Sequence, residues 1–383
     1  MLVPSESIEG ACFLRSCWMG RLRVSLFCLI TAIAIAGDAK AAERVAILVR
    51  PAVWEVLRVD IERYQDAVKS ERKVEFEMLV SDFRDAADVR QRLKTLWTEK
   101  RIEGAILVGA IPMHQFFMHE HANPNPLFYE DFDLPFVDAN EDGVDDAYRG
   151  KPNPKIWIAN VRSSELATND DIDGLRRFFT KANAYHNNLV RYVHKAVIIT
   201  DAELGMREDE TRFAQTLFGE SGVDFFASPN NTLENFRKTF QQKPCAICVM
   251  GVHSDWSAQE LVGGELTAEE IRRLTTGAIL TLNHGCSTGN WCAAESEKSG
   301  MSTAQSWVFG DSVGLTVIAN VRSGCIYGCE KLTKSLANGR TIAQAYWEAK
   351  LAGEREMNEE YPDGSIVSGV LLIGDPFLVF EKR

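Results

Sequence analysis

Short apolar runs alternate with longer amphipathic stretches along most of this chain of 383 residues. Apolar runs of four to eight residues between turn signals are typical of buried parallel strands, whereas an apolar residue every three or four positions indicates a helix packed on one face. In the first half we expect strands at residues 43–50, 73–80, 104–109 and 156–161, and helices at 53–69, 85–100 and 170–187. Residues 111–154 follow neither pattern and are rich in Pro, Asn, Asp and aromatic residues, which is typical of a long loop that is functional or disordered.

The same alternation resumes after residue 190. We expect strands at 194–200, 223–226, 246–250, 278–282 and 314–319, and helices at 208–218, 231–241, 301–309 and 341–351. Apolar runs around Gly374-Asp375-Pro376 close the chain. Repeated alternation of strand and helix predicts an α/β protein with a mainly parallel sheet. We expect two consecutive α/β subdomains, residues 42–190 and 191–383.

The N-terminus has the pattern of a signal peptide. Arg15, Arg21 and Arg23 precede an apolar run at 24–36, and Ala39-Lys40-Ala41 follows as a cleavage site of the A-x-A type. The run is too short to span a bilayer as a mature helix, and no other stretch is long and apolar enough. We therefore expect residues 1–41 to be removed and the mature protein to be secreted or periplasmic, without a membrane anchor.

The formal net charge of −12 argues against a general nucleic-acid-binding protein, which would carry a basic face. The partners that we expect are proteins or peptides.

Two apolar runs in the second half each end in a polar turn with a reactive side chain. The run that starts at Pro244 ends before His253, and the run that starts at Gly277 ends before Cys286. Residues 266–274 between them suggest a helix with Thr267 as its N-cap. A strand–helix–strand unit makes the two strands parallel, so both side chains are expected at the carboxyl edge of one sheet, where ligand sites of α/β proteins form.

A cysteine beside a histidine is the arrangement of a nucleophile and its base. The amides of Gly285, Cys286 and Ser254 are the candidate donors to the oxyanion of the reaction. Residues 285–289, Gly-Cys-Ser-Thr-Gly, also match the nucleophile elbow of serine hydrolases. That fold needs a histidine after the serine, and the last histidine in the chain is His284, so the order of residues excludes it.

These motifs resemble the gingipain-type cysteine peptidases of the caspase-like superfamily. The likeness lies in the apolar strands that end at His253 and at Cys286, in the turn from Cys286 to Gly289, in the closing Leu371–Pro376 motif and in the strand 104–109, and it covers most of residues 43–383. It implies a three-layer αβα sandwich and an endopeptidase that needs no cofactor, with Cys286 and His253 as the catalytic dyad. It also implies that the strand end at Asn320 and Arg322 helps to form the pocket for the residue before the scissile bond.

Two positions depart from the family's pattern. Ser254 replaces a glycine after the histidine, and Lys155 stands where the resemblance implies a carboxylate that orients the histidine. Asp255 is the alternative partner for His253. Two other interpretations therefore stay open: an inactive gingipain-like homologue that acts as a binding or scaffold protein, and a sortase-like transpeptidase that uses the same dyad.

An acidic segment predicts a calcium site. Asp138, Asn140, Asp142 and Asp146 occupy ligand positions of a calcium loop with Gly143 at its sixth position, although Arg149 replaces the glutamate at the twelfth. An acidic turn without metal is the alternative.

The remaining cysteines and histidines suggest less specific roles. We interpret Cys245 and Cys248 as core or disulfide cysteines, because residues three apart on a strand face opposite sides. His284 is expected to pack beside the site. His114, His119 and His121 are expected in a solvated loop, with a transition-metal site as the alternative.

Overall fold

The computed structural model describes residues 42–118, 121–163, 169–204, 207–241, 243–296, 300–323, 329–357 and 369–380. The expected signal peptide, residues 1–41, lies outside the described residues. Residues 43–383 form one compact unit. Among the described helices, none is both long and apolar enough to cross a membrane.

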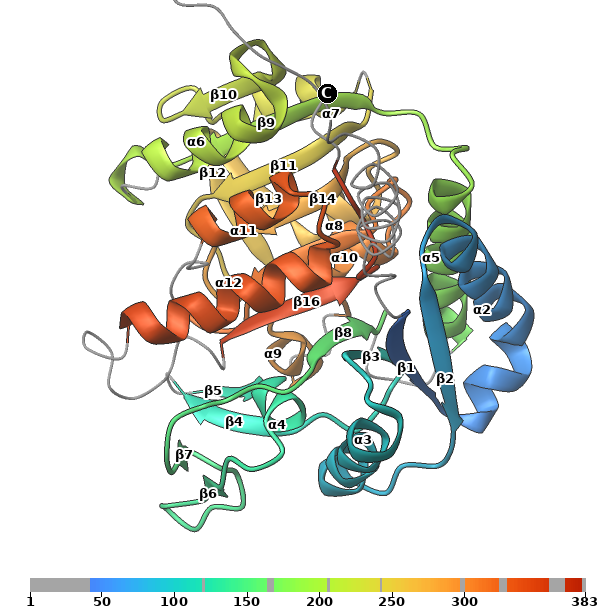
Figure 1. The fold of residues 1–383 in the computed structure, drawn as a ribbon. Coiled ribbons are helices and arrows are strands. Elements are labelled where there is room, and N and C mark those ends of the chain that lie inside the picture. The colour runs from blue at the N-terminus through green and yellow to red at the C-terminus, as the bar shows by residue number, and fades with distance from the viewer. Residues whose placement is uncertain are drawn as a thin grey trace, which may run out of the picture. The chain divides into compact units, whose positions relative to one another are not determined.

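A ten-stranded sheet forms the centre of this unit (Figure 1). Its strands, in spatial order, are β10 (Val223–Ala227), β9 (Val193–Thr200), β11 (Cys245–Gly251), β14 (Ala278–Asn283), β15 (Thr316–Asn320), β16 (Val370–Gly374), β8 (Trp157–Val161), β3 (Gly104–Val108), β1 (Glu43–Val49) and β2 (Val74–Val80). Neighbouring strands are parallel except for β15 and β16, which are antiparallel. The mainly parallel α/β sheet is thus confirmed.

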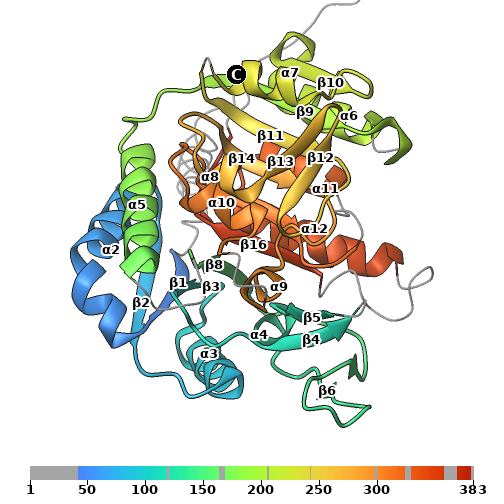
Figure 2. The same ribbon diagram turned by 180° about the vertical axis from the view of Figure 1, so that it is seen from behind.

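The helices cover both faces of the sheet (Figures 1 and 2). On one face lie α3 (Ala86–Lys100), α6 (Arg207–Phe218), α11 (Cys329–Ala337) and α12 (Ile342–Met357). On the other face lie α2 (Pro51–Glu71), α5 (Asn169–His186), α8 (Ala268–Arg272) and α10 (Thr303–Phe309), with α7 (Leu233–Phe240) packed on α10 through Phe236 and Trp307. These layers form the expected αβα sandwich.

Most elements lie where the apolar periodicity predicts them, and side-chain caps fix several helix starts. Asp85 accepts a hydrogen bond from the amide of Asp88 at the start of α3, and Thr232 does the same for Asn235 at the start of α7. Ser302 and Gln305 form a capping box at the start of α10. Such caps satisfy amides that the helix itself leaves unpaired.

Three regions differ from the predicted pattern, and one of them is α11, which the periodicity did not predict. Residues 111–154 contain two hairpins and a helical turn instead of one irregular loop: β4 (Gln115–Met118), β5 (His121–Pro124), α4 (Leu127–Glu130), β6 (Phe136–Val137) and β7 (Ala147–Tyr148). Between β11 and β14 the helix predicted at residues 266–274 is shorter and corresponds to α8. The residues before it form a hairpin instead, in which β12 (Ala258–Leu261) pairs with β13 (Gly264–Thr267). Thr267 is nevertheless the N-cap of α8, as predicted.

Three further short elements complete the second half: η1 (Ala202–Leu204), η2 (Glu220–Gly222) and α9 (Trp291–Ser296). The boundary expected between residues 190 and 191 falls in the connection from α5 to β9. The sheet is continuous across this boundary, because β16 of the second part pairs with β8 of the first.

The closing Gly374-Asp375 turn holds the two parts together. Gly374 has φ +101°, and a Cβ atom there would overlap with the carbonyl oxygen of Leu315, so a side chain does not fit. The carboxylate of Asp375 is fully buried and accepts hydrogen bonds from Tyr64 of α2 at 2.9 Å and from His186 of α5 at 2.7 Å. The motif therefore has a structural role: it anchors β16 to two helices of the first half.

Candidate active site

His253 and Cys286 follow two neighbouring parallel strands, β11 and β14. The strands pair in register from Cys245 opposite Ala278 to Met250 opposite Asn283, and the amide of His284 extends the ladder by donating to the carbonyl of Met250 at 2.9 Å. Both strands are fully buried and mainly apolar, which favours this register. The structure thus brings the two predicted residues to adjacent turns at the carboxyl edge of the sheet.

The two turns contact each other directly. The hydroxyl of Ser254 donates to the carbonyl of Cys286 at 3.1 Å. A Cβ atom on Gly285 would overlap with this hydroxyl oxygen, so the close approach of the turns requires a glycine at 285. The predicted support residues Ser254 and Gly285 are therefore part of one interlocked unit, and the Ser254 side chain is engaged in holding it.

The turn after Cys286 is shaped by backbone hydrogen bonds to the end of β15. Ser287 has φ +57°, and its amide donates to the carbonyl of Arg322 at 3.0 Å. The amide of Gly289 donates to the carbonyl of Asn320 at 2.7 Å. The amide of Gly285 lies 3.3 Å from the Asn283 side chain, whereas that of Cys286 donates to no residue that the structure describes. Of these amides, the one of Cys286 is thus the most available donor.

Asn320 and Arg322, predicted as substrate-pocket residues, lie beneath this turn. Asn320 is buried, and its side-chain amide donates to the carbonyls of His284 at 3.0 Å and Gly285 at 3.3 Å. Arg322 is also largely buried, and its guanidinium donates to the carbonyl of Ser323 at 2.6 Å. Both residues support the Cys286 turn, and their contact with substrate stays a prediction.

The backbone of His253 is held on both sides, while its side chain is exposed. Its carbonyl accepts a hydrogen bond from the amide of Glu260 at 2.8 Å, and its amide lies 3.4 Å from a carboxylate oxygen of Asp201. No described residue forms a hydrogen bond with the imidazole, so the ring is free to meet a substrate.

Asp255, the expected partner of the imidazole, is engaged elsewhere. Its Oδ1 atom accepts hydrogen bonds from the amide and hydroxyl of Ser257, at 2.6 and 2.8 Å, and from the amide of Ala258 at 2.9 Å. These contacts shape the turn that enters β12. An orienting role for Asp255 toward His253 stays a prediction.

Asp201 is a candidate that the sequence did not reveal. It follows β9, the other neighbour of β11, and its amide donates to the carbonyl of Gly251 at 2.8 Å. One carboxylate oxygen faces the His253 amide, and the other accepts a hydrogen bond from the buried Asn231 at 2.6 Å. Asp201 therefore helps to hold the backbone at His253.

Lys155, by contrast, lies far from His253. It precedes β8, which is separated from β11 by β14, β15 and β16, and its amide donates to the carbonyl of Glu130. Lys155, at the position where the resemblance implied an orienting carboxylate, is therefore not on a strand next to β11. The carboxylate of Asp201, at the neighbouring strand end, contacts the backbone amide of His253.

The other cysteines and His284 have the surroundings of core residues. His284 is fully buried, which lowers its pKa to about 4 and keeps the ring neutral. Burial raises the pKa of Cys245 to about 12 and that of Cys248 well above its usual value, so neither thiol ionises readily. Both are free and buried, whereas the free thiol of Cys286 is partly exposed. This confirms that His284, Cys245 and Cys248 are packed residues.

His114 is buried rather than solvated, which corrects the expectation of a solvated loop. Its ring stacks on Phe128 at a centroid distance of 3.9 Å, and Nε2 lies 2.7 Å from a carboxylate oxygen of Asp145. Burial lowers the pKa of His114 more than Asp145 raises it. The residue fastens the acidic segment to the aromatic cluster beneath it.

The expected calcium ligands form a network of turns on the surface. Asp138 accepts hydrogen bonds from the amides of Asp142 at 3.2 Å and Gly143 at 2.7 Å, and Asp146 accepts one from Ala139 at 2.9 Å. Asn140 donates to Asp142 at 3.1 Å. Within the described residues no group of three or more His, Cys, Asp or Glu side chains is arranged to hold a metal. Calcium binding therefore stays a prediction.

Comparison with solved structures identifies the fold. The crystal structure of the Arg-specific cysteine proteinase gingipain R (RgpB) matches with a TM-score of 0.65 and 14% identity, over 90% of this chain and 79% of that chain. A complex of the pro- and mature domains of RgpB from Porphyromonas gingivalis gives a TM-score of 0.65 and 16% identity, over 88% and 80% of the two chains. A third structure, described only as a protease, gives a TM-score of 0.65 and 10% identity, over 89% and 79%.

No protein-family model matches the chain, and no curated protein does. The three solved structures show that the chain has a gingipain-like fold, a caspase-like α/β sandwich, as the sequence motifs implied. At these low identities the likeness establishes the fold alone. The activity must be argued from the residues of this chain.

Proposed function

We propose that the protein is an exported cysteine endopeptidase that uses Cys286 as nucleophile and His253 as proton carrier. The observation that carries the proposal is the pair of interlocked turns, which begin from adjacent parallel strands and are joined by the hydrogen bond from Ser254 to Cys286. The half-buried thiol and the exposed imidazole then share one edge of the sheet. The gingipain-like fold and the signal-peptide pattern support the proposal.

In this mechanism His253 takes the thiol proton, and the Cys286 sulfur attacks the carbonyl carbon of the scissile bond. His253 returns the proton to the leaving amine as the carbon–nitrogen bond breaks, which leaves a thioester. A water molecule, deprotonated by His253, then hydrolyses the thioester and regenerates the thiol. The amide of Cys286 is the proposed donor to the oxyanion, and such a donor contributes about 2.7–4 kcal/mol in other enzymes.

A peptidyl acyloxymethyl ketone tests the nucleophile. Mass mapping of the labelled protein is expected to find the probe on Cys286, and Cys286→Ala is expected to remove both the label and the hydrolysis of a fluorogenic peptide library. Cys292→Ala is the matched control, because Cys292 follows the same turn but is buried. Unchanged hydrolysis in Cys286→Ala would rule out the proposal. The library also reports which residue is preferred before the cut.

A binding or scaffold protein is the second candidate. The observation in its favour is that no described residue forms a hydrogen bond with the imidazole of His253, so nothing orients the ring before a substrate arrives. A protein of this kind would bind peptides without cutting them and would show no selective labelling of Cys286. A transpeptidase would label like the peptidase, but its products would gain the mass of an added amine.

A further inference from the structure

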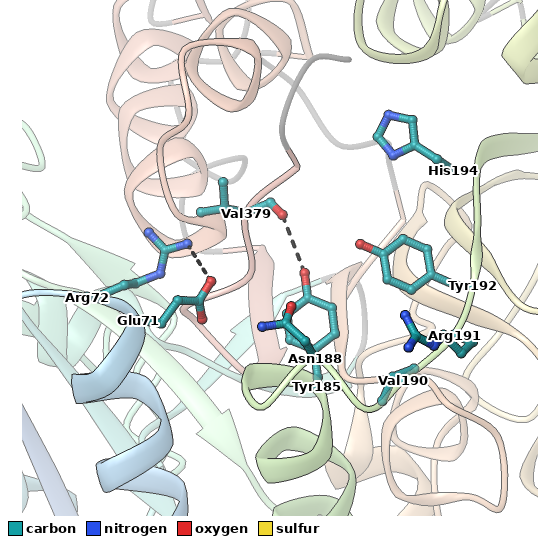
Figure 3. A pocket seen from close by; sticks show the side chains of 9 residues that line it. All are labelled: Glu71, Arg72, Tyr185, Asn188, Val190, Arg191, Tyr192, His194 and Val379. Atoms are coloured by element: carbon teal, nitrogen blue, oxygen red, sulfur yellow. Dashed lines mark hydrogen bonds and ion pairs between the residues drawn. The ribbon is translucent and has the colours of Figure 1, made fainter.

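A pocket of about 320 Å³ opens where the two halves of the chain join. It is lined by the end of α2, the end of α5, the connection from α5 to β9 and the residue Val379 near the C-terminus (Figure 3). The volume falls at the lower end of the range for pockets that bind small molecules. The pocket lies at the amino end of β9, while Asp201 follows the carboxyl end, so eight residues of strand, about 26 Å, separate it from the candidate active site.

Two arginines face each other across this pocket. Figure 3 shows Arg72 on one side and Arg191 on the other. The Nε atom of Arg72 is buried without a hydrogen-bond partner. Arg191 is exposed, and it forms no salt bridge or hydrogen bond with any residue that the structure describes. Guanidinium groups bind carboxylate and phosphate oxygens in pairs of hydrogen bonds, so this pair provides donors for an anion.

The one carboxylate of the lining, that of Glu71, is already paired with two cations. Its Oε2 atom lies 2.6 Å from Nδ1 of His186, and its Oε1 atom lies 3.5 Å from Arg72. Burial opposes a charge on His186, but Asp375 and Glu71 outweigh it and raise its pKa to about 9. His186 is therefore positively charged at neutral pH. Because His186 shares its single charge between Glu71 and Asp375, Arg72 balances the rest of these two carboxylates, and the net positive charge left at the pocket is that of Arg191.

Two tyrosines are among the residues that line the pocket. The rings of Tyr185 and Tyr192 lie with their centroids 6.3 Å apart and their planes inclined by 21°. The Tyr185 hydroxyl donates to the carbonyl of Val379 at 3.4 Å, which fixes this ring at the pocket (Figure 3). A planar ligand body stacks favourably on such rings.

We propose that this pocket binds a small organic anion, a phosphate or carboxylate group carried on a planar body. Arg72 and Arg191 hold the charged group, and the two tyrosines pack against the body. The bound anion links the end of α2 in the first half to the start of β9 in the second. The site is separate from the proposed peptidase centre and does not depend on it.

Isothermal titration of the full chain with phenyl phosphate at constant ionic strength tests the proposal. We expect saturable binding of one molecule, at least about tenfold tighter than that of inorganic phosphate, which lacks the ring, or of phenol, which lacks the charge. Arg191→Gln and Arg72→Gln are each expected to weaken binding about tenfold or more, the effect of losing a charge-assisted hydrogen bond. Cys286→Ala is expected to bind phenyl phosphate like the unchanged protein.

Arg58→Gln is the matched control, since Arg58 lies on α2, the helix that Arg72 caps, but is largely exposed to solvent. Its affinity is expected to equal that of the unchanged protein. Because Arg191 is exposed, its variant is expected to melt at the same temperature as the unchanged protein, so a loss of binding reports the site itself. Absence of saturable binding, equal binding of phenol, or full affinity in the Arg72→Gln/Arg191→Gln double variant would each overturn the proposal.

Discussion

The imidazole of His186 is buried between two carboxylates, whereas that of His253 stands exposed at the edge of the same sheet. His186 donates from Nδ1 to Glu71 and from Nε2 to Asp375, at 2.6 and 2.7 Å. Both nitrogens are occupied, so the ring is protonated and can neither accept nor release a proton in a reaction. His253 is held only through its backbone, and its two nitrogens remain open to a substrate.

The difference shows where each part of this molecule uses its polar groups. Around Asp375, the polar side chains of Tyr64 and His186 are paired with its carboxylate and fix the positions of α2, α5 and β16. At the carboxyl edge of β11 and β14, hydrogen bonds fix the backbone and leave the reactive side chains unpaired. Histidine in the first setting stabilises the fold, and in the second it is available for chemistry.

The largest expected effect is a loss of catalysis at the carboxyl edge of β11 and β14. His253→Ala is expected to lower kcat/KM by about 10⁴-fold, since loss of a member of a nucleophile–base pair has effects of this order in other hydrolases. The free energy of unfolding should change by less than about 0.5 kcal/mol, because the side chain is exposed. Peptide hydrolysis and urea denaturation measure the two quantities. A variant with unchanged kcat/KM would remove His253 from the mechanism.

His186→Gln tests the buried histidine, and we expect it to lower the stability of the protein and not its activity. It leaves the carboxylate of Asp375 buried without its cation, and breaking such a pair costs about 3–5 kcal/mol. Among correctly folded molecules kcat/KM should be unchanged. Because the pKa of His186 is raised to about 9, above its usual 6.5, its contribution is complete below pH 6.5 and is lost as the pH rises through 9.

Urea denaturation at pH 6 and pH 10 checks this dependence. The unchanged protein should lose stability between the two values, and His186→Gln should lack that part of the loss. Equal losses in both proteins would show that His186 is not the group responsible.

A smaller effect is expected from Asp201→Asn. Asparagine keeps an oxygen that can accept the His253 amide but removes the negative charge, so kcat/KM should fall about tenfold through weaker stabilisation of the imidazolium. Glu203→Gln removes the same charge from an exposed position two residues further along, and we expect it to retain full activity. If both variants lose activity equally, the effect is one of general charge and not of the position of Asp201.

The sequence predicted the pair at the active edge because a local rule determines it. Two parallel strands joined by a short crossover lie side by side, so His253 and Cys286 had to meet. Asp201 could not be found in this way. The next strand in the chain, β10, pairs with the outer edge of β9. The inner edge of β9 is therefore left to pair with β11, which places Asp201 beside His253 in the order of strand ends. The order of strands depends on the packing of the whole sheet, which no segment encodes alone.

The same reason applies to Lys155. The resemblance implied a carboxylate at this position, but three strands, β14, β15 and β16, separate β8 from β11. The hairpin of β12 and β13 was missed because its strands have four residues each, too few to show a period of two. The burial of His114 was missed because it depends on Phe128 and Asp145, which lie 14 and 31 positions further along the chain.

The smallest expected effect concerns the acidic segment and calcium. The carboxylates of Asp138 and Asp146 already accept backbone hydrogen bonds, so an ion must compete with them, and only weak binding is expected. With a dissociation constant of about 1 mM, typical of extracellular calcium modules, 5 mM calcium would stabilise the protein by about 1 kcal/mol and raise Tm by about 2 °C. Asp142→Asn should abolish the rise, and magnesium should not replace calcium. An unchanged Tm at this concentration would contradict calcium binding, and the segment would then be an acidic turn that its own backbone amides stabilise.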